Sequence, residues 1–442
     1  MNTILAPLRE LGEYEEIQKQ LNTQQGKVSI SGCVDSQKLH MVYGLTEKYD
    51  VKLIVTYSDM KAKELLDDCK LYCRESYYFP AKDLIFYQAD IHSNQLIKER
   101  VAVLRKLLEG EPITIVTTFS ALMAHQLPLS VWQENVIEIE EGGIAEEAAI
   151  ARQLVKMGYE KNYQVEAPGQ FSVRGGIVDI FDLTRENPVR IELWGDEVES
   201  IRSFDIESQR SIEKLTEVSI YPATELILSK KALEDGLARM EKDCKKSAAF
   251  FREETKPEEA HRLEQAVAEL KEQVTQFQSF VNLESYIGYF YEETQSLVDF
   301  VADRKLCICL DEPARIEEHA NAVELEFRES MSTRAEKGYI LPEQMNVLYG
   351  AREIYARLDK NRLLALSTME YKGFPVKFQN RYAVNARNVS SYNNSFPELV
   401  KDLNHYKKNG YRVLLVSASS TRAKRLATDL MDEGLNAFYS DN

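Results

Sequence analysis

The first candidate for chemistry is a phosphate-binding pattern near the N-terminus. Residues 32–39 read Gly-Cys-Val-Asp-Ser-Gln-Lys-Leu and follow a predicted strand. A strand, a glycine turn and a helix form the usual phosphate-binding loop, whose lysine contacts phosphate and whose hydroxyl holds Mg²⁺. Gly32 and Lys38 match this pattern, but Gln37 replaces the second glycine and Leu39 replaces the hydroxyl. The sequence therefore predicts a degenerate nucleotide site with no meaningful ATP binding or hydrolysis.

Two further features bear on that site. Asp35 places a negative charge inside the loop, where phosphates would have to sit. The apolar strand predicted at residues 305–310 ends in Asp311 and Glu312, an arrangement that holds Mg²⁺ in nucleotide-hydrolysing proteins. The alternative interpretation is a strand end that caps the helix beginning at Ala314. Because the partner loop lacks its hydroxyl, we favour the cap.

A third candidate is a β-strand with an unusual outward face. Alternation over residues 189–194 places Arg190, Glu192 and Trp194 on the polar face, with Glu192 available to hold Arg190. Arg174 precedes a glycine pair that predicts a bulge aiming its side chain out of the pleat. Arg and Trp are enriched at binding hot spots, which favours a protein-binding face. We expect the side chains of Arg174, Arg190 and Trp194 to face solvent in the free chain. The alternative is an ordinary solvated strand with Trp194 packed under a loop.

The same region resembles a known family. The resemblance is carried by three ordered runs, namely Arg-Gly-Gly-Ile-Val-Asp-Ile-Phe (174–181), Pro-Val-Arg-Ile-Glu-Leu (188–193) and Asp-Glu-Val-Glu-Ser-Ile-Arg-Ser-Phe-Asp (196–205). They are similar to the signature of the UvrA-binding domain shared by the bacterial repair protein UvrB and the transcription-repair coupling factors. The likeness extends over residues 10–370 as a UvrB-like module, and is closer to the N-terminal part of the coupling factors.

The resemblance implies a non-catalytic interaction module that recruits UvrA to stalled RNA polymerase in nucleotide excision repair. The implied UvrA-binding residues are Arg174, Arg190, Glu192 and Trp194, although family members commonly carry Phe at the Trp194 position. The resemblance implies no cofactor for this chain. It further implies that polymerase and DNA are bound by domains absent here, and that the protein's own C-terminal domain masks the UvrA face.

The competing hypothesis is a UvrB-like ATP-dependent protein that handles damaged DNA. Such proteins insert an aromatic-rich hairpin near residue 85, where this sequence has no room for it. Tyr77, Tyr78, Phe86 and Tyr87 offer a base-stacking set. We favour core packing at a sheet edge for these aromatic residues.

Composition limits the remaining possibilities. The 442 residues carry a formal net charge of −16, which predicts weak DNA affinity because phosphate binding requires a basic surface. No apolar run approaches the roughly 20 residues of a membrane span, and no signal peptide is recognisable, so we expect a cytoplasmic protein. The six cysteines form no C-x-x-C pair, and none lies at zinc-ligand spacing from a histidine.

The elements that must position these residues alternate between strand and helix patterns, which predicts an α/β fold. We expect a degenerate P-loop, helicase-like parallel sheet formed by residues 1–135 and 226–372. A β-rich UvrA-binding domain, residues 136–225, is inserted between its halves. Residues 373–442 are expected to form a small, truncated α/β domain with strands at 411–417 and 436–440.

Overall fold

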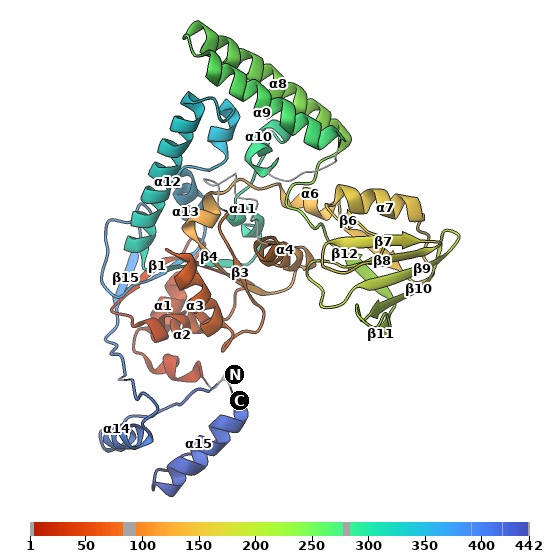
Figure 1. The fold of residues 1–442 in the computed structure, drawn as a ribbon. Helices are drawn as coiled ribbons and strands as arrows, with labels where there is room; N and C mark the ends of the chain where they lie inside the picture. Colours follow the sequence, from red (N-terminus) through yellow and green to blue (C-terminus); the bar gives the residue numbers. More distant parts are fainter. Residues whose placement is uncertain (1–3, 83–93, 277–282, 390, 418, 441–442) are drawn as a thin grey trace.

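The computed structural model describes residues 4–82, 94–276, 283–389, 391–417 and 419–440 (Figure 1). An α/β body carries a β-rich module on one side and a long helical hairpin on another. The last two helices, α14 (Phe396–Lys408) and α15 (Ser420–Asp432), lie near the N-terminal end of the chain.

The body is built on a seven-stranded sheet in which all paired strands are parallel. The spatial order is β15-β1-β14-β13-β2-β4-β3. The strands are β1 (Lys27–Ser31), β2 (Val51–Thr56), β3 (Ser76–Phe79), β4 (Ile113–Thr118), β13 (Leu306–Asp311), β14 (Leu363–Leu366) and β15 (Asn380–Ala383). Because β13 and β14 lie between β1 and β2, chain segments before and after the module share one sheet.

Helices cover both faces of this sheet, as buried parallel strands require. Alternate strand residues enter two separate cores, so that Leu53 and Val55 join one and Ile54 joins the other. The Ile54 core lies under η1 (Ala6–Glu10), α1 (Tyr14–Leu21), α2 (Asp35–Leu45) and α3 (Asp59–Cys69). The other core lies under α4 (Asn94–Glu109), α5 (Phe119–Met123), α11 (Leu297–Val301), α12 (Pro313–Glu336) and α13 (Ala351–Asp359).

The module contains a six-stranded sheet whose strands follow one another in sequence order, from β6 to β11. They are β6 (Glu160–Lys161), β7 (Gln170–Arg174), β8 (Ile177–Ile180), β9 (Val189–Trp194), β10 (Glu197–Phe204) and β11 (Ser211–Leu215). One face is apolar and shares a core with Ile150 and Leu154 of α7 (Glu147–Lys156). The pair β5 (Ile137–Glu140) and β12 (Glu217–Ile220) joins the entry and exit of the module.

The long charged stretch after the module forms two antiparallel helices. Helix α8 (Lys230–Glu253) and helix α9 (Pro257–Gln276) are separated at Pro257, and their apolar stripes pack together. The short elements η2 (Leu283–Tyr286), α10 (Ile287–Phe290) and η3 (Pro342–Asn346) pack together between this hairpin and α12 of the body. Helix α6 (Leu129–Gln133) precedes the module. No helix in the described part of the chain is long and apolar enough to span a membrane.

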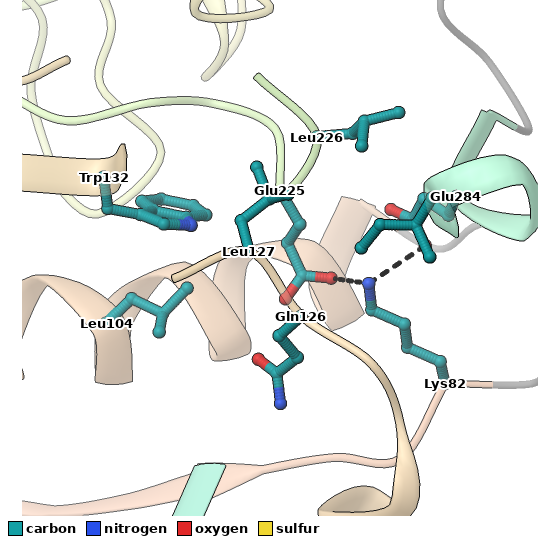
Figure 2. A pocket seen from close by; sticks show the side chains of 9 residues that line it. Lys82, Leu104, Gln126, Leu127, Trp132, Glu225, Leu226 and Glu284 are labelled. Carbon is teal, nitrogen blue, oxygen red and sulfur yellow. Dashed lines mark ion pairs between the residues drawn. The ribbon is translucent and has the colours of Figure 1, made fainter. Parts of the chain in front are cut away.

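Buried charges fix the junction between module and body. Figure 2 shows the Lys82 ammonium between the carboxylates of Glu225, just after β12, and Glu284. Lys82 lies 2.6 Å from Glu225 and 3.2 Å from Glu284, and Arg100 of α4 donates to Glu225 at 2.6 Å. Burial alone raises the pKa of Glu225, but Arg100 and Lys82 outweigh it and lower that pKa to about 2. The module is therefore anchored to α4 through paired charges.

The sheet order confirms the predicted fold class, a parallel α/β domain interrupted by a mostly-β domain. The exact domain boundaries stay a prediction. The strands predicted at 411–417 and 436–440 are wrong, because neither described segment belongs to a sheet. A strand needs a hydrogen-bonded neighbour, and α14 and α15 instead bury a small core containing Leu403 and Leu430.

Candidate protein-binding face and nucleotide-like site

The predicted interface residues lie on the polar face of the module's sheet. On β9, Arg190, Glu192 and Trp194 alternate with buried apolar residues. Directly opposed residues of antiparallel strands project from the same face. Arg174 of β7 and Glu192 of β9 both lie opposite Ile177 of β8, which places Arg174 on that face too. The structure therefore places all four residues on one face of the sheet.

Asp179, on β8, binds both predicted arginines. Its carboxylate accepts hydrogen bonds from Arg190 Nε at 2.6 Å, Arg190 Nη2 at 2.8 Å and Arg174 Nη2 at 2.9 Å. The Asp179 side chain is only 1% exposed, and charge-assisted bonds are strongest away from water. Hydrogen bonding to Asp179, opposed in part by burial, raises the pKa of Arg190. The two guanidinium groups are thus positioned before any partner binds.

The prediction that Arg190 faces solvent is wrong. Its side chain is 14% exposed, its guanidinium lies 4.4 Å from the centre of the buried Phe204 ring, and Gln209 Oε1 accepts a third bond at 2.9 Å. Arg174 is more accessible, with 37% of its side chain exposed. Alternation identifies the face of a residue but not its partner on the next strand, which here is Asp179 directly opposite Arg190.

Glu192 does not hold Arg190, contrary to the prediction. Its carboxylate accepts bonds from Arg202 Nη2 and from Ser200 Oγ, both on β10. Ser200 lies directly opposite Glu192 across the β9–β10 ladder, so this pairing is set by strand register. Glu192 therefore orients Arg202, a cation that sequence reasoning did not single out.

Trp194 is exposed, with 79% of its surface accessible to solvent. The alternative in which a neighbouring loop covers this ring is therefore wrong. Trp194 ends β9 at the turn formed by Gly195 and Asp196, and Glu197 lies opposite it on β10. A large ring left in water at a hairpin end is free to be buried by a partner.

The residues of the phosphate-loop pattern form a tight turn that is covered by neighbouring backbone segments. Gly32 has φ of +80°, and a Cβ at this position would lie 2.1 Å from the backbone oxygen of Val384. The Cys33 amide donates to the Ser367 carbonyl at 3.1 Å and is therefore not free to bind a phosphate oxygen. The segments that follow β14 and β15 thus pack directly against the loop.

Lys38 is enclosed by acidic groups. Its ammonium donates to Glu312 at 2.7 Å, Asp311 at 2.8 Å and Asp35 at 3.0 Å, and its side chain is only 3% exposed. Burial disfavours the charged amine, but the carboxylates, Asp311 first, outweigh it and raise the pKa of Lys38. Burial is likewise outweighed at Glu312, whose bonds with Lys38 and Thr368 lower its pKa. Carboxylates thus occupy the positions around Lys38 that phosphate oxygens would need.

The helix-cap interpretation of Asp311 and Glu312 is wrong. Glu312 is the residue before α12 and has a left-handed backbone, with φ of +56°, and its side chain makes no cap hydrogen bond. Asp311 instead accepts from Thr56 at 2.8 Å as well as from Lys38. Both acids bind side chains that are distant in the sequence, because the parallel sheet brings the ends of β1, β2 and β13 to one edge.

The remaining predicted residues of this site contribute no ligand group. Leu39 is buried in the core, and Gln37 Oε1 is buried without a partner among the described residues. The part of the chain that the structure describes contains no cluster of His, Cys, Asp or Glu able to hold a metal ion. At the sheet edge, Tyr78 is buried and donates to Asp59, which supports core packing, whereas Phe86 and Tyr87 lie outside the described residues.

Sequence reasoning missed Asp179, the residue that organises the binding face. Its only signal was a carboxylate placed inside an otherwise apolar strand, where an unpaired charge is costly. Lys61, which binds Asp35 at 3.1 Å, and Thr56 were missed because their partners lie on other elements.

Comparison with known proteins first defines the class of the module. Residues 137–226 match the family model described as the UvrB interaction domain. The module is therefore of the UvrB interaction type.

The whole chain is then similar to the transcription-repair-coupling factors. It is 31% identical over its full length to that of Bacillus subtilis, 26% identical over 92% of its length to that of Staphylococcus epidermidis, and 26% identical over 91% to that of Staphylococcus haemolyticus. It spans 37% of the first relative and 34% of the other two. The resemblance to the N-terminal region of these factors, predicted from the sequence, is confirmed.

Proposed function

We propose that this chain is a non-catalytic interaction module that recruits UvrA in transcription-coupled nucleotide excision repair. One observation carries the proposal, namely the exposed Trp194 ring on the same sheet face as the arginine pair held by Asp179, inside the UvrB interaction domain. Trp and Arg dominate binding hot spots, and side chains held in place before binding lose little entropy when a partner docks. The face is thus suited to bind a protein with acidic and apolar surface groups.

In this proposal, UvrA is delivered to an RNA polymerase stalled at a lesion. Binding of polymerase and DNA, and ATP-driven translocation, are assigned to other domains of such a factor. The C-terminal domains of the full-length protein are proposed to mask the Trp194 face until recruitment is needed. The net charge of −16 is consistent with a chain that contributes protein contacts rather than tight DNA binding.

Calorimetric titration of purified UvrA with the chain tests the proposal. Trp194→Ala should weaken binding by about thirtyfold, equivalent to roughly 2 kcal/mol, and leave the melting temperature unchanged. Arg174→Ala should cause a comparable loss. The matched control is Phe250→Ala, which removes another exposed aromatic ring, on the α8–α9 hairpin. Unaltered UvrA binding by Trp194→Ala would contradict the proposed face.

The second candidate is a UvrB-like ATPase, favoured by the glycine turn at Gly32 and by Lys38 at a shared sheet edge. Against it, the Lys38 ammonium already donates to three carboxylates. Adding a triphosphate there would bring like charges together in a buried site. We therefore propose that the site is a degenerate remnant. Calorimetry with Mg-ATP should show no binding, and micromolar affinity would support the ATPase instead.

A related test concerns DNA. A gel-shift at roughly 0.15 M salt should show little retention of either intact or damaged DNA, because a strongly acidic chain gains little from counterion release. Salt-resistant, lesion-selective binding would favour the UvrB-like alternative.

A further inference from the structure

Ile144 is a large apolar side chain exposed at the end of the β9–β10 hairpin. It forms an isolated antiparallel bridge with Glu197. The backbone around it is held firmly, because the Gly142 amide donates to Val198 at 2.8 Å and the Ala145 amide donates to Asp196 at 2.7 Å. Ile144 therefore occupies a defined position beside the hairpin, although 81% of its surface is accessible to solvent.

Strand register aligns Ile144 with Trp194. Glu197 lies opposite Trp194 on one side and opposite Ile144 on the other. Opposed residues project from the same face, so the three side chains form one row across the polar face of the module. Two strand spacings separate Ile144 from Trp194, a distance of about 10 Å. Neighbouring exposed apolar groups with polar surroundings are typical of interaction sites.

The charges on this face are unevenly distributed. Glu197 is exposed and takes part in no ion pair among the described residues. Arg174 lies on β7, three strands away from Glu197, and its guanidinium is partly exposed. Arg174 also lies 6.0 Å from the ring of Tyr163, which is itself exposed. A carboxylate between two apolar groups thus lies on β10, and a cation beside an aromatic ring lies on β7, three strands away.

We propose that Ile144 and Glu197 complete the docking site, so that Ile144 and Trp194 together receive one apolar ridge of UvrA. The inference deepens the proposed function and rests on it. Covering this row would remove Glu197 from water, and a carboxylate buried without a partner is costly. The UvrA surface must therefore present a Lys or Arg opposite Glu197 and an acidic group opposite Arg174. Glu197 selects a partner with this order of charges.

Titration of UvrA with three variants of the full chain tests the inference. Ile144→Ser should weaken binding about tenfold, and Glu197→Lys should weaken it more than tenfold, because it places two cations face to face. The matched control is Ile212→Ser, which alters another exposed isoleucine on β11 beside the far end of β10, about 20 Å from Glu197. Control and unsubstituted chain should bind equally.

The outcomes separate the inference from the proposed function. If Trp194→Ala weakens binding as expected while Ile144→Ser and Glu197→Lys bind normally, the wider site is refuted and the UvrA face stands. If the unsubstituted chain does not bind UvrA, both are refuted. Melting temperatures of all variants should match that of the unsubstituted chain, since Ile144 and Glu197 are exposed. The Ile144→Ser and Trp194→Ala losses should be non-additive if both side chains contact one ridge.

Discussion

Replacing Asp179 by Asn tests how the binding face is held together. The substitution preserves the shape of the side chain but removes its charge and turns one acceptor oxygen into a donor. Three bonds, at 2.6, 2.8 and 2.9 Å, are weakened or lost, and Arg190 remains largely buried without a counter-charge. Breaking a buried pair from one side costs about 3–5 kcal/mol. Because Arg174 is partly exposed and can return to water, we expect a loss of about 2–4 kcal/mol of unfolding free energy.

Urea denaturation followed by circular dichroism measures this loss, and UvrA titration measures its consequence for binding. The matched control is Glu192→Gln, on the same face, whose partner Arg202 is about one third exposed, so its cost should stay below about 1 kcal/mol. Asp179→Asn should also weaken UvrA binding under conditions where the variant remains folded. If Asp179→Asn unfolds at the same urea concentration as the unsubstituted chain, the bonds from Asp179 to Arg190 and Arg174 do not stabilise the module, and this prediction is wrong.

Three further predictions concern the body and its junction with the module. The pKa of Glu225 is about 2 in the folded chain, against 4.5 in the unfolded chain. The ionised carboxylate therefore stabilises the fold fully above pH 4.5, and this contribution is lost as the pH falls towards 2. An acid titration of unfolding should show about 3 kcal/mol of this dependence, and Glu225→Gln should reduce it. Lys38→Met leaves Asp311 and Glu312 without their cation and should lower the unfolding free energy, measured by urea denaturation, by about 3 kcal/mol. The control Lys61→Met, whose acidic partners are exposed, should lower it by less than about 1 kcal/mol. Tyr355→Phe removes a buried hydroxyl that has no partner among the described residues, and it should preserve or raise the melting temperature. The hydroxyl of Tyr349 bonds Thr294 at 2.8 Å, so Tyr349→Phe should lower the unfolding free energy by about 1 kcal/mol.

The sequence alone was sufficient for features that depend on local order along the chain. The alternation of strand and helix patterns predicted the parallel α/β body, and the alternation in residues 189–194 placed Arg190, Glu192 and Trp194 on one face. The missing glycine and hydroxyl at Gln37 and Leu39 were equally readable, because a phosphate-loop pattern lies within eight consecutive residues.

Tertiary structure alone decided which side chains meet. The alternation of β9 could not reveal that Asp179 on β8, rather than Glu192, holds Arg190, because a strand's partner depends on register. It likewise could not show that Ile144 aligns with Trp194 through Glu197. The predicted cap at Glu312 failed for the same reason, since Lys38 and Glu312 are 274 positions apart in the sequence and meet only when the parallel sheet forms. Periodicity records the direction of each side chain, whereas the energy of a buried charge depends on its neighbours in space.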